Sequence, residues 1–160
     1  MPSYKLRKAV KQDLEGANHI FSLADTQHRK AHPEIFQKTF DPKDTKDYLL
    51  SCIKSKDAAV FVAENYGEII GGILASVRQT PNNSALVPQI YLNIEKLVVA
   101  PAFRRQGVGR ALMEHIQLWA EERGLEHIQL TVWDFNQAGQ EFYNNLGYEM
   151  IHHRMRKELP

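Results

Sequence analysis

The chain has 160 residues, of which 43% are hydrophobic and 24% charged, and its formal net charge is +1. This length and apolar content suit one domain over residues 1–160, and the near-zero charge argues against nucleic acid or a membrane surface as the main partner. The lone cysteine, Cys52, excludes an internal disulfide. Because no apolar run reaches the length of a signal peptide or a membrane span, we expect a cytoplasmic protein.

The N-terminal third predicts one strand and two helical segments. Tyr4 and Leu6 alternate with basic residues, as in a half-buried strand. Asp13 stands where it can cap a helix, and apolar residues follow it at helical spacing: Leu14, Ala17, Phe21 and Ala24. Residues 26–46, which include Phe40-Asp41-Pro42, are expected to be irregular or partly helical, and a short helix is expected over residues 45–55.

The middle of the chain predicts three strands. Residues 58–64 and 68–77 form two of them, and Asn65-Tyr66-Gly67 between them is typical of a hairpin turn. Residues 78–88 hold prolines and asparagines and are expected to be a loop. A long strand over residues 89–99 follows, and it ends before Pro101, which has no backbone N–H for a ladder.

The C-terminal part alternates helices and strands. Apolar residues recur on one helical face at Val108, Leu112, Ile116 and Trp119. Gly124 is placed to end that helix. A strand is expected over residues 127–133, a helix over 137–146 and a closing strand over 148–156. The order β-α-α-β-β-β-α-β-α-β predicts a mixed α/β domain.

The most informative stretch, which we name the phosphate loop, runs from residue 99 to residue 111. A strand ends, a short basic turn follows, and a helix begins at once. The first N–H groups of a helix lack internal partners and carry partial positive charge, so they bind anions. Gly107 and Gly109 let a pyrophosphate approach these amides, and Arg104, Arg105 and Arg110 add positive charge. The stretch predicts a phosphate cradle.

Two common phosphate-binding motifs do not fit this stretch. Leu112 occupies the third glycine position of the dinucleotide fingerprint. Gly109-Arg110-Ala111 lacks the Gly-Lys-Ser/Thr ending of a nucleotide-triphosphate loop. The remaining alternative to a cradle is a surface turn with solvated arginines.

Three segments together resemble the GNAT superfamily of N-acetyltransferases. Arg104-x-x-Gly107-x-Gly109 matches its Arg/Gln-x-x-Gly-x-Gly/Ala motif, and residues 97–101 resemble its central strand and exit. Asn136, Phe142-Tyr143 and Gly147-Tyr148 match its C-terminal motif in spacing. Gly139 stands where the family often has alanine, and Tyr148 where phenylalanine is commoner.

The resemblance implies an α/β GNAT fold: a central mixed, mostly antiparallel sheet, splayed between two parallel strands and flanked by helices. It implies transfer of an acetyl group from acetyl-CoA to a primary amine of a small molecule, peptide or protein, with no metal. By this resemblance, the residues that hold coenzyme A are Leu97, Val98, Val99, Arg104, Arg105, Gln106, Gly107, Val108, Gly109, Arg110, Ala111, Asn136, Gly139, Phe142 and Tyr143.

Two residues are expected to move protons. Strand alternation puts Tyr91, Asn93 and Glu95 on one face, and a polar row on a central strand suits a wet substrate cleft. Glu95 also stands where related acetyltransferases carry a glutamate, so it is the predicted general base, acting directly or through water. Tyr143 matches the family's acid tyrosine and is the predicted donor to the leaving thiolate. A backbone N–H near Val98 or Val99 is expected to stabilise the oxyanion.

Several alternatives stay open from the sequence. A domain that binds acyl-CoA as a sensor but has lost turnover would keep the same cradle. The acceptor is expected to contact residues 21–40 and 78–89, whose side chains name no substrate, and a homodimer is possible. His28 and His32 are four apart but lack a third metal ligand at a recognised spacing. Cys52 is expected to be a buried small hydrophobe.

Overall fold

The structure is a computed structural model that describes residues 3–37 and 42–160. The chain forms two compact units, one up to Leu130 (the first unit) and one from Thr131 to Pro160 (the second unit). The single domain over residues 1–160 stays a prediction. The elements of the first unit are β1 (Lys5–Lys8), α1 (Leu14–Ala31), α2 (Pro42–Lys54), β2 (Ala58–Asn65), β3 (Glu68–Gln79), β4 (Ile90–Val99), α3 (Val108–Glu121) and β5 (Ile128–Leu130).

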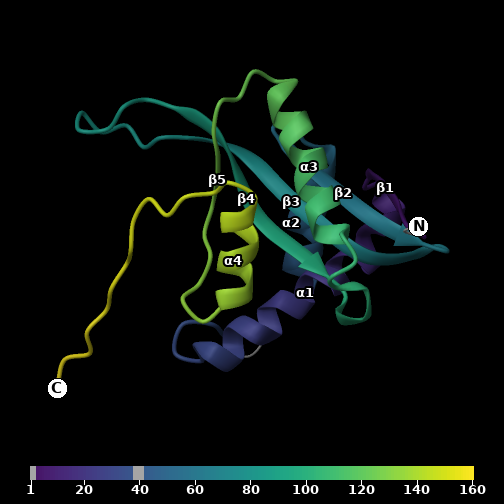
Figure 1. Cartoon of the computed structure of the whole chain (residues 1–160), viewed down its shortest axis with the longest axis horizontal. Helices are drawn as coiled ribbons and strands as arrows, with labels where there is room; N and C mark the ends of the chain where they lie inside the picture. Colours follow the sequence, from purple (N-terminus) through teal and green to yellow (C-terminus); the bar gives the residue numbers. More distant parts are fainter. Residues whose placement is uncertain (1–2, 38–41) are drawn as a thin grey trace. The chain divides into compact units, whose positions relative to one another are not determined.

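The strands form one sheet in the order β1-β2-β3-β4-β5 (Figure 1). Neighbours from β1 to β4 pair antiparallel, and β5 pairs parallel to β4. Between β2 and β3 the turn residues Tyr66 and Gly67 both have positive φ, 48° and 86°, which suits a two-residue hairpin turn. The predicted mixed, mostly antiparallel sheet and its central hairpin are confirmed.

Helices cover both faces of the sheet. A side chain at Gly72 would meet Phe21 of α1 at 3.0 Å, whereas one at Gly71 would meet Val108 of α3 at 3.2 Å. Successive strand residues point to opposite faces, so α1 and α3 lie on opposite sides. The core between α1, α2 and the sheet includes Cys52, whose thiol has its pKa raised by burial. The expected structural role of Cys52 is confirmed.

The helix α3 forms where the sequence predicts it. One face is buried, and it consists of Val108, Leu112, Met113, Ile116, Trp119 and Ala120. α3 ends at Glu121, and the turn after it reaches Gly124, whose φ of 69° and N–H bond to the Glu121 carbonyl fit the predicted left-handed cap. The Leu125 N–H closes the cap on the Ala120 carbonyl at 3.1 Å.

An irregularity in β4 lies at Glu95. Ile94 pairs with Ala75 and Lys96 with Leu74, so Glu95 is an extra residue with no partner in β3. Such a bulge re-aims side chains and often lies beside an active site. On its other edge β4 pairs with β5 only over Leu92 to Ile94. The β4–β5 ladder of the first unit therefore ends one residue before the bulge, and the predicted splay stays a prediction.

Three sequence predictions are wrong in detail. The described part of residues 26–46 is partly helical as predicted, since α1 continues to Ala31 and α2 begins at Pro42. Residues 38–41, including Phe40 and Asp41, lie outside the described part. Asp13 precedes α1 but makes no side-chain cap bond there, because its carboxylate binds Arg7. The strand predicted over 127–133 is only Ile128–Leu130, and no strand forms over 148–156.

The second unit contains one helix, α4 (Gln137–Asn145). The described residues that follow it, 148–160, have no regular structure, and the apolar side chains of Ile151 and Met155 are 74% and 92% exposed. A strand needs a neighbouring backbone for its hydrogen bonds, and alternation in the sequence cannot supply one. This explains why the closing strand is absent here.

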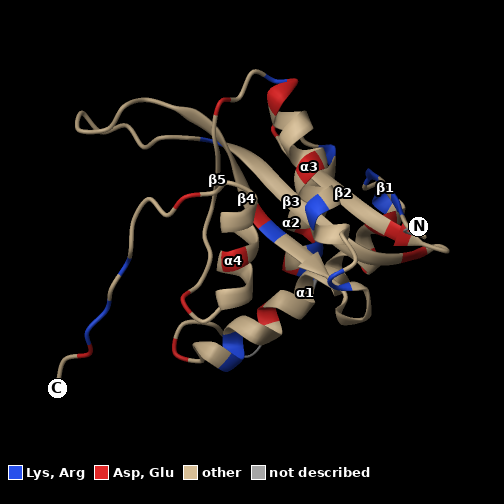
Figure 2. Cartoon of the chain, in the orientation of Figure 1, with Lys and Arg blue, Asp and Glu red and all other residues tan. Residues whose placement is uncertain are grey.

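Acidic and basic residues are interspersed along the ribbon (Figure 2). Of the helices the structure describes, none combines the length and the apolar character that crossing a membrane requires.

Candidate active site

The phosphate loop has the geometry of an anion site. Gly107 is the residue before α3, with φ of 85°, and the first helical bond runs from the Ala111 N–H to the Gly107 carbonyl at 3.0 Å. No side chain of the described residues caps this helix end. The amides of Val108, Gly109 and Arg110 therefore keep their hydrogen-bonding capacity for a ligand.

The arginines of the loop differ in their roles. The Nε of Arg104 donates to the Val99 carbonyl at 2.9 Å, so this side chain ties the loop to the end of β4. Arg105 has a positive φ of 61°, unusual for a side chain with a Cβ. Gln106 donates to the Ala102 carbonyl at 3.1 Å. Arg105 and Arg110 are exposed and surround the helix start with positive charge.

Within the first unit, the edge of β4 beyond the β5 ladder, which we name the open edge, offers backbone groups at alternate residues. The Ala100 N–H donates to the Ile70 carbonyl, on the β3 side, at 2.8 Å. Because backbone N–H and carbonyl groups alternate between the two edges of a strand, those of Val98, which pairs with Gly72, also point toward β3. Leu97 and Val99 then point their N–H and carbonyl groups to the other edge, where Arg104 takes the Val99 carbonyl. Of the three predicted pantetheine partners, Leu97 and Val99 face the open edge and Val98 does not.

Glu95 is the centre of a side-chain cluster from three elements, which we name the Glu95 cluster: Tyr48 of α2, Ser76 and Arg78 of β3, and Glu95. The Tyr48 hydroxyl lies 2.7 Å from both carboxylate oxygens of Glu95. The Ser76 hydroxyl donates to Oε1 at 3.0 Å, and Nη2 of Arg78 donates to the same oxygen at 2.6 Å. The Glu95 side chain is 15% exposed.

The two oxygens of Glu95 are not equivalent. Oε1 has three donors around it, whereas among the described residues Oε2 has only the Tyr48 hydroxyl. A carboxylate oxygen has about two lone-pair sites. Burial first, and then the bond to Glu95, raises the pKa of Tyr48, so this phenol is a donor at neutral pH. Oε2 is thus the oxygen of Glu95 with room for a further proton donor.

The bulge extends the polar row beyond Glu95. Tyr91 and Asn93 pair with Arg78 and Ser76 and share the predicted face with Glu95. Because Glu95 is the extra residue, Lys96 lies on this face as well, where its Nζ pairs with Asp25 of α1 at 3.5 Å. The alternation of residues 91–95 is confirmed, and the sequence gives no sign of Tyr48, Ser76 or Lys96 as neighbours of Glu95.

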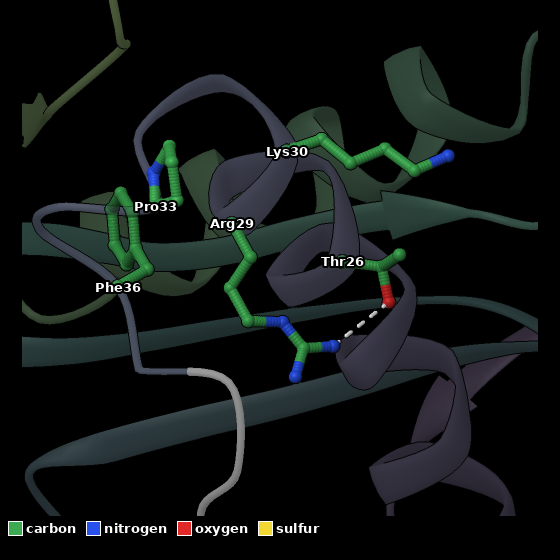
Figure 3. Close-up of a pocket in the computed structure, with 5 residues that line it drawn as sticks. All are labelled: Thr26, Arg29, Lys30, Pro33 and Phe36. Carbon is green, nitrogen blue, oxygen red and sulfur yellow. Dashed lines mark hydrogen bonds between the residues drawn. The ribbon is translucent and has the colours of Figure 1, made fainter.

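A shallow pocket of about 290 Å³ lies at the C-terminal end of α1. Figure 3 shows its lining, which consists of Thr26, Arg29, Lys30, Pro33 and Phe36, with Arg29 donating to the Thr26 hydroxyl at 3.3 Å. This is part of the segment predicted to contact the acceptor. Phe21 in that segment is buried instead, and residues 38–40 are outside the described ranges. In the described chain, no three His, Cys, Asp or Glu side chains come together as metal ligands.

In the second unit Asn136 caps α4. Its side-chain oxygen accepts from the Gly139 N–H at 2.9 Å, which leaves the amide NH₂ to donate elsewhere. A Cβ at Gly139 would lie 2.4 Å from that nitrogen, so glycine here makes room for the Asn136 side chain.

Tyr143 of α4 packs among aromatic rings. Its ring centroid lies 5.2 Å from that of Phe142 and 5.9 Å from that of Tyr148, both edge to face. Burial, and secondarily Tyr148, raises the pKa of Tyr143 to about 12. The phenol therefore keeps its proton at neutral pH, as a proton donor must.

Comparison with known proteins decides the family. A sequence model of the acetyltransferase (GNAT) family matches residues 18–148. The chain belongs to this family. An uncharacterized N-acetyltransferase of Methanocaldococcus jannaschii is 26% identical over 147 residues, which is 92% of this chain but 61% of that relative. The chain thus spans less than two thirds of the length of this GNAT relative.

Solved structures share the GNAT fold. A point mutant of the BH1408 protein from Bacillus halodurans superposes with a TM-score of 0.87 at 24% identity, over 98% of this chain and 99% of that one. AAC(6')-Iy, solved with the bisubstrate analog CoA-S-monomethyl-acetylneamine, gives 0.76 at 19% identity over 99% of both chains. At these identities the likeness shows the fold, and the predicted fold class is confirmed.

Proposed function

We propose that this protein transfers an acetyl group from acetyl-CoA directly to a primary amine. The observation that supports this most is the arrangement along β4. A carboxylate with an open oxygen sits at the bulge, the open backbone edge begins two residues later, and an uncapped helix start follows the strand. Residues 95–111 thus contain, in order, a candidate general base, a strand edge that can hydrogen-bond an extended ligand, and a helix start that can bind an anion.

The cofactor side fits coenzyme A, which supplies the acetyl group as an activated thioester. The amides of residues 106–110 would hold its pyrophosphate, with Arg104, Arg105 and Arg110 adding charge; the Ala111 N–H, predicted to join them, already bonds the Gly107 carbonyl. The backbone of Leu97 would pair with the pantetheine arm, since the Val99 carbonyl already accepts from Arg104. Asn136, Gly139, Phe142 and Tyr143 of the second unit stay predicted coenzyme A residues on the ground of the family resemblance alone.

Glu95 is the proposed base. An amine with a pKa of about 10 is mostly an ammonium at neutral pH and has no lone pair for attack. Oε2 of Glu95 would accept its proton, directly or through a water, while Oε1 stays fixed by Ser76 and Arg78. The amine nitrogen then bonds to the acetyl carbon as the carbon–sulfur bond breaks.

Two donors would stabilise the charges that develop. The Val99 N–H, which faces the open edge of β4, would donate to the carbonyl oxygen; Val98 is a poorer candidate because it faces β3. Tyr143 would give its phenolic proton to the departing thiolate. Each assignment uses a group whose hydrogen atom is present at neutral pH.

The second candidate function is an acyl-CoA sensor without turnover, which the same cradle would serve. The test is thiol release from acetyl-CoA with a panel of primary amines, measured beside calorimetric binding of coenzyme A. Release with at least one amine supports the enzyme. Binding without release for any amine supports the sensor, and no binding contradicts both. A cytoplasmic location and a homodimer stay predictions.

A further inference from the structure

Arg78 has hydrogen-bonding capacity that the Glu95 cluster does not use. Its Nη2 binds Glu95 at 2.6 Å and its Nε binds the Ser76 hydroxyl at 3.1 Å. Within residues 3–37 and 42–160, Nη1 has no partner. The side chain is 51% exposed, whereas the Glu95 side chain is 15% exposed. The cation thus lies at the solvent side of the proposed base.

We propose that Arg78 binds a carboxylate of the acceptor, and that the acceptor is therefore an amine that carries a carboxylate close to its amino group, such as a free amino acid. This rests on the proposed function, because it assigns the amino group to Glu95. Arginine holds carboxylates through two parallel N–H bonds from two of its nitrogens, and here Nη1 and the second N–H of Nη2 remain for such a pair.

The charges around Glu95 favour such a dipolar acceptor. Two ion pairs stand next to each other on this face of the sheet, Glu95 with Arg78 and Lys96 with Asp25. An ammonium of the acceptor is attracted to the two carboxylates, Glu95 and Asp25, and a carboxylate of the acceptor is attracted to the two cations, Arg78 and Lys96. A simple monoamine would leave Arg78 without a new partner, and so would gain less on binding.

The same charges disfavour a polycationic acceptor. The pocket at the end of α1 is lined in part by Lys30, which lies on the same helix as Asp25. This further cation would repel an acceptor with several ammonium groups. This pocket is also the alternative place where a carboxylate could bind, and the experiment has to separate it from Arg78.

The experiment compares amino acids with their carboxamides and with the amines that lack the carboxylate. KM for each is measured by thiol release from acetyl-CoA, for the parent protein, Arg78→Gln, Arg78→Lys and Lys30→Gln. For the best amino acid, KM should be lower than for its carboxamide by about 10- to 100-fold in the parent. Arg78→Gln should remove this difference, Arg78→Lys should restore part of it, and Lys30→Gln should keep it.

The ratio between the paired acceptors is the readout because a merely structural role of Arg78 would change both members equally. Equal KM values in the parent, a ratio that survives Arg78→Gln, or a ratio lost in Lys30→Gln would overturn the proposal. If no amine releases thiol, the proposed function fails. The proposal about Arg78 is then tested by calorimetric binding of the same amino acid and carboxamide pairs in the presence of coenzyme A. Tighter binding of the amino acid that Arg78→Gln abolishes supports the proposal. Equal binding of the two, or a preference that Arg78→Gln leaves in place, overturns it.

Discussion

The first unit contains two arginine–carboxylate clusters of similar composition that differ in how completely they are satisfied. In the first, which we name the Arg7 cluster, Arg7 joins Asp13 and Glu64. All three guanidinium nitrogens of Arg7 have carboxylate partners, at 2.6 to 2.8 Å. Asp13 also accepts the Val10 N–H at 2.8 Å. In the Glu95 cluster, by contrast, Nη1 of Arg78 and one side of Oε2 are unused by the part of the chain that the structure describes.

This difference separates a structural ion pair from a candidate active site. The Arg7 cluster ties β1 and the start of α1 to β2, and the guanidinium of Arg7 has no N–H group left for a ligand. The Glu95 cluster keeps a donor and an acceptor at a bulge beside an open strand edge. A guanidinium whose N–H groups all have partners within the protein stabilises the fold. A guanidinium and a carboxylate that keep hydrogen-bonding capacity in a partly buried position can bind a ligand.

The largest effect is expected from Glu95→Gln. The side-chain oxygen of the glutamine still accepts a hydrogen bond from Tyr48, but the amide cannot take a proton from the substrate ammonium. The kcat should therefore fall on the order of 10³-fold. Steady-state thiol release measures it, and coenzyme A affinity should be unchanged. Glu64→Gln makes the same change in the Arg7 cluster and should leave kcat as it is. An equal loss in both variants would contradict the distinction between the clusters.

Gly109→Glu tests the cofactor side separately. A carboxylate at the uncapped start of α3 would repel a pyrophosphate and occupy its place, so coenzyme A should bind about 100-fold more weakly by calorimetry. Leu118→Glu, at a 57% exposed position of the same helix, is the control and should bind normally. Unchanged affinity in Gly109→Glu would place the cofactor elsewhere.

Tyr143→Phe tests the proposed acid. Turnover should fall roughly 100-fold, because the thiolate then leaves without a proton. Since burial raises the pKa of Tyr143 to about 12, its ionisation should not reduce kcat of the parent below about pH 11. Tyr148→Phe is the matched control, since Tyr148 packs on the same ring with a pKa also raised to about 12. A decline of kcat with a midpoint near 10 would argue against this environment.

Asp13→Asn should change stability and leave activity intact. Losing the charge that Arg7 binds should cost about 2 kcal/mol in the free energy of unfolding at pH 7, by urea denaturation. The bonds from Arg7 lower the pKa of Asp13, against the opposing effect of burial. The contribution of Asp13 is therefore complete above its unfolded pKa of about 3.9 and is lost as pH falls through the lower folded value. A constant difference between parent and variant down to pH 2 would contradict this.

The parts of the site that are contiguous in sequence could be predicted from it. The phosphate loop needs only a strand end, glycines and a helix start within residues 99–111, and local spacing encodes all three. The alternation that places Glu95 beside Tyr91 and Asn93 is equally local. Tyr48 is 47 residues from Glu95, and no spacing rule connects them. The bulge that brings Lys96 to the same face is defined by the pairing of β4 with β3. The sequence of β4 alone therefore does not predict it.

The errors in the fold have the same origin. Residues 25–30 are polar and show no apolar stripe, yet α1 continues through them to Ala31. The helix stops at His32, which precedes Pro33 and leaves the helical conformation. The segment 148–156 shows the opposite error: its sequence pattern predicts a strand, but no strand forms because no described segment pairs with it. Helical bonds are local and need no apolar pattern, whereas strands require a partner.

The most direct measurement is a calorimetric titration of the protein with coenzyme A and, separately, with pantetheine, which lacks the nucleotide and its pyrophosphate. If the amides at the start of α3 hold that pyrophosphate, coenzyme A should bind at least about 100-fold more tightly than pantetheine. Equal affinity for the two, or no binding of coenzyme A at millimolar concentration, would contradict the assignment of this loop and of the activity built on it.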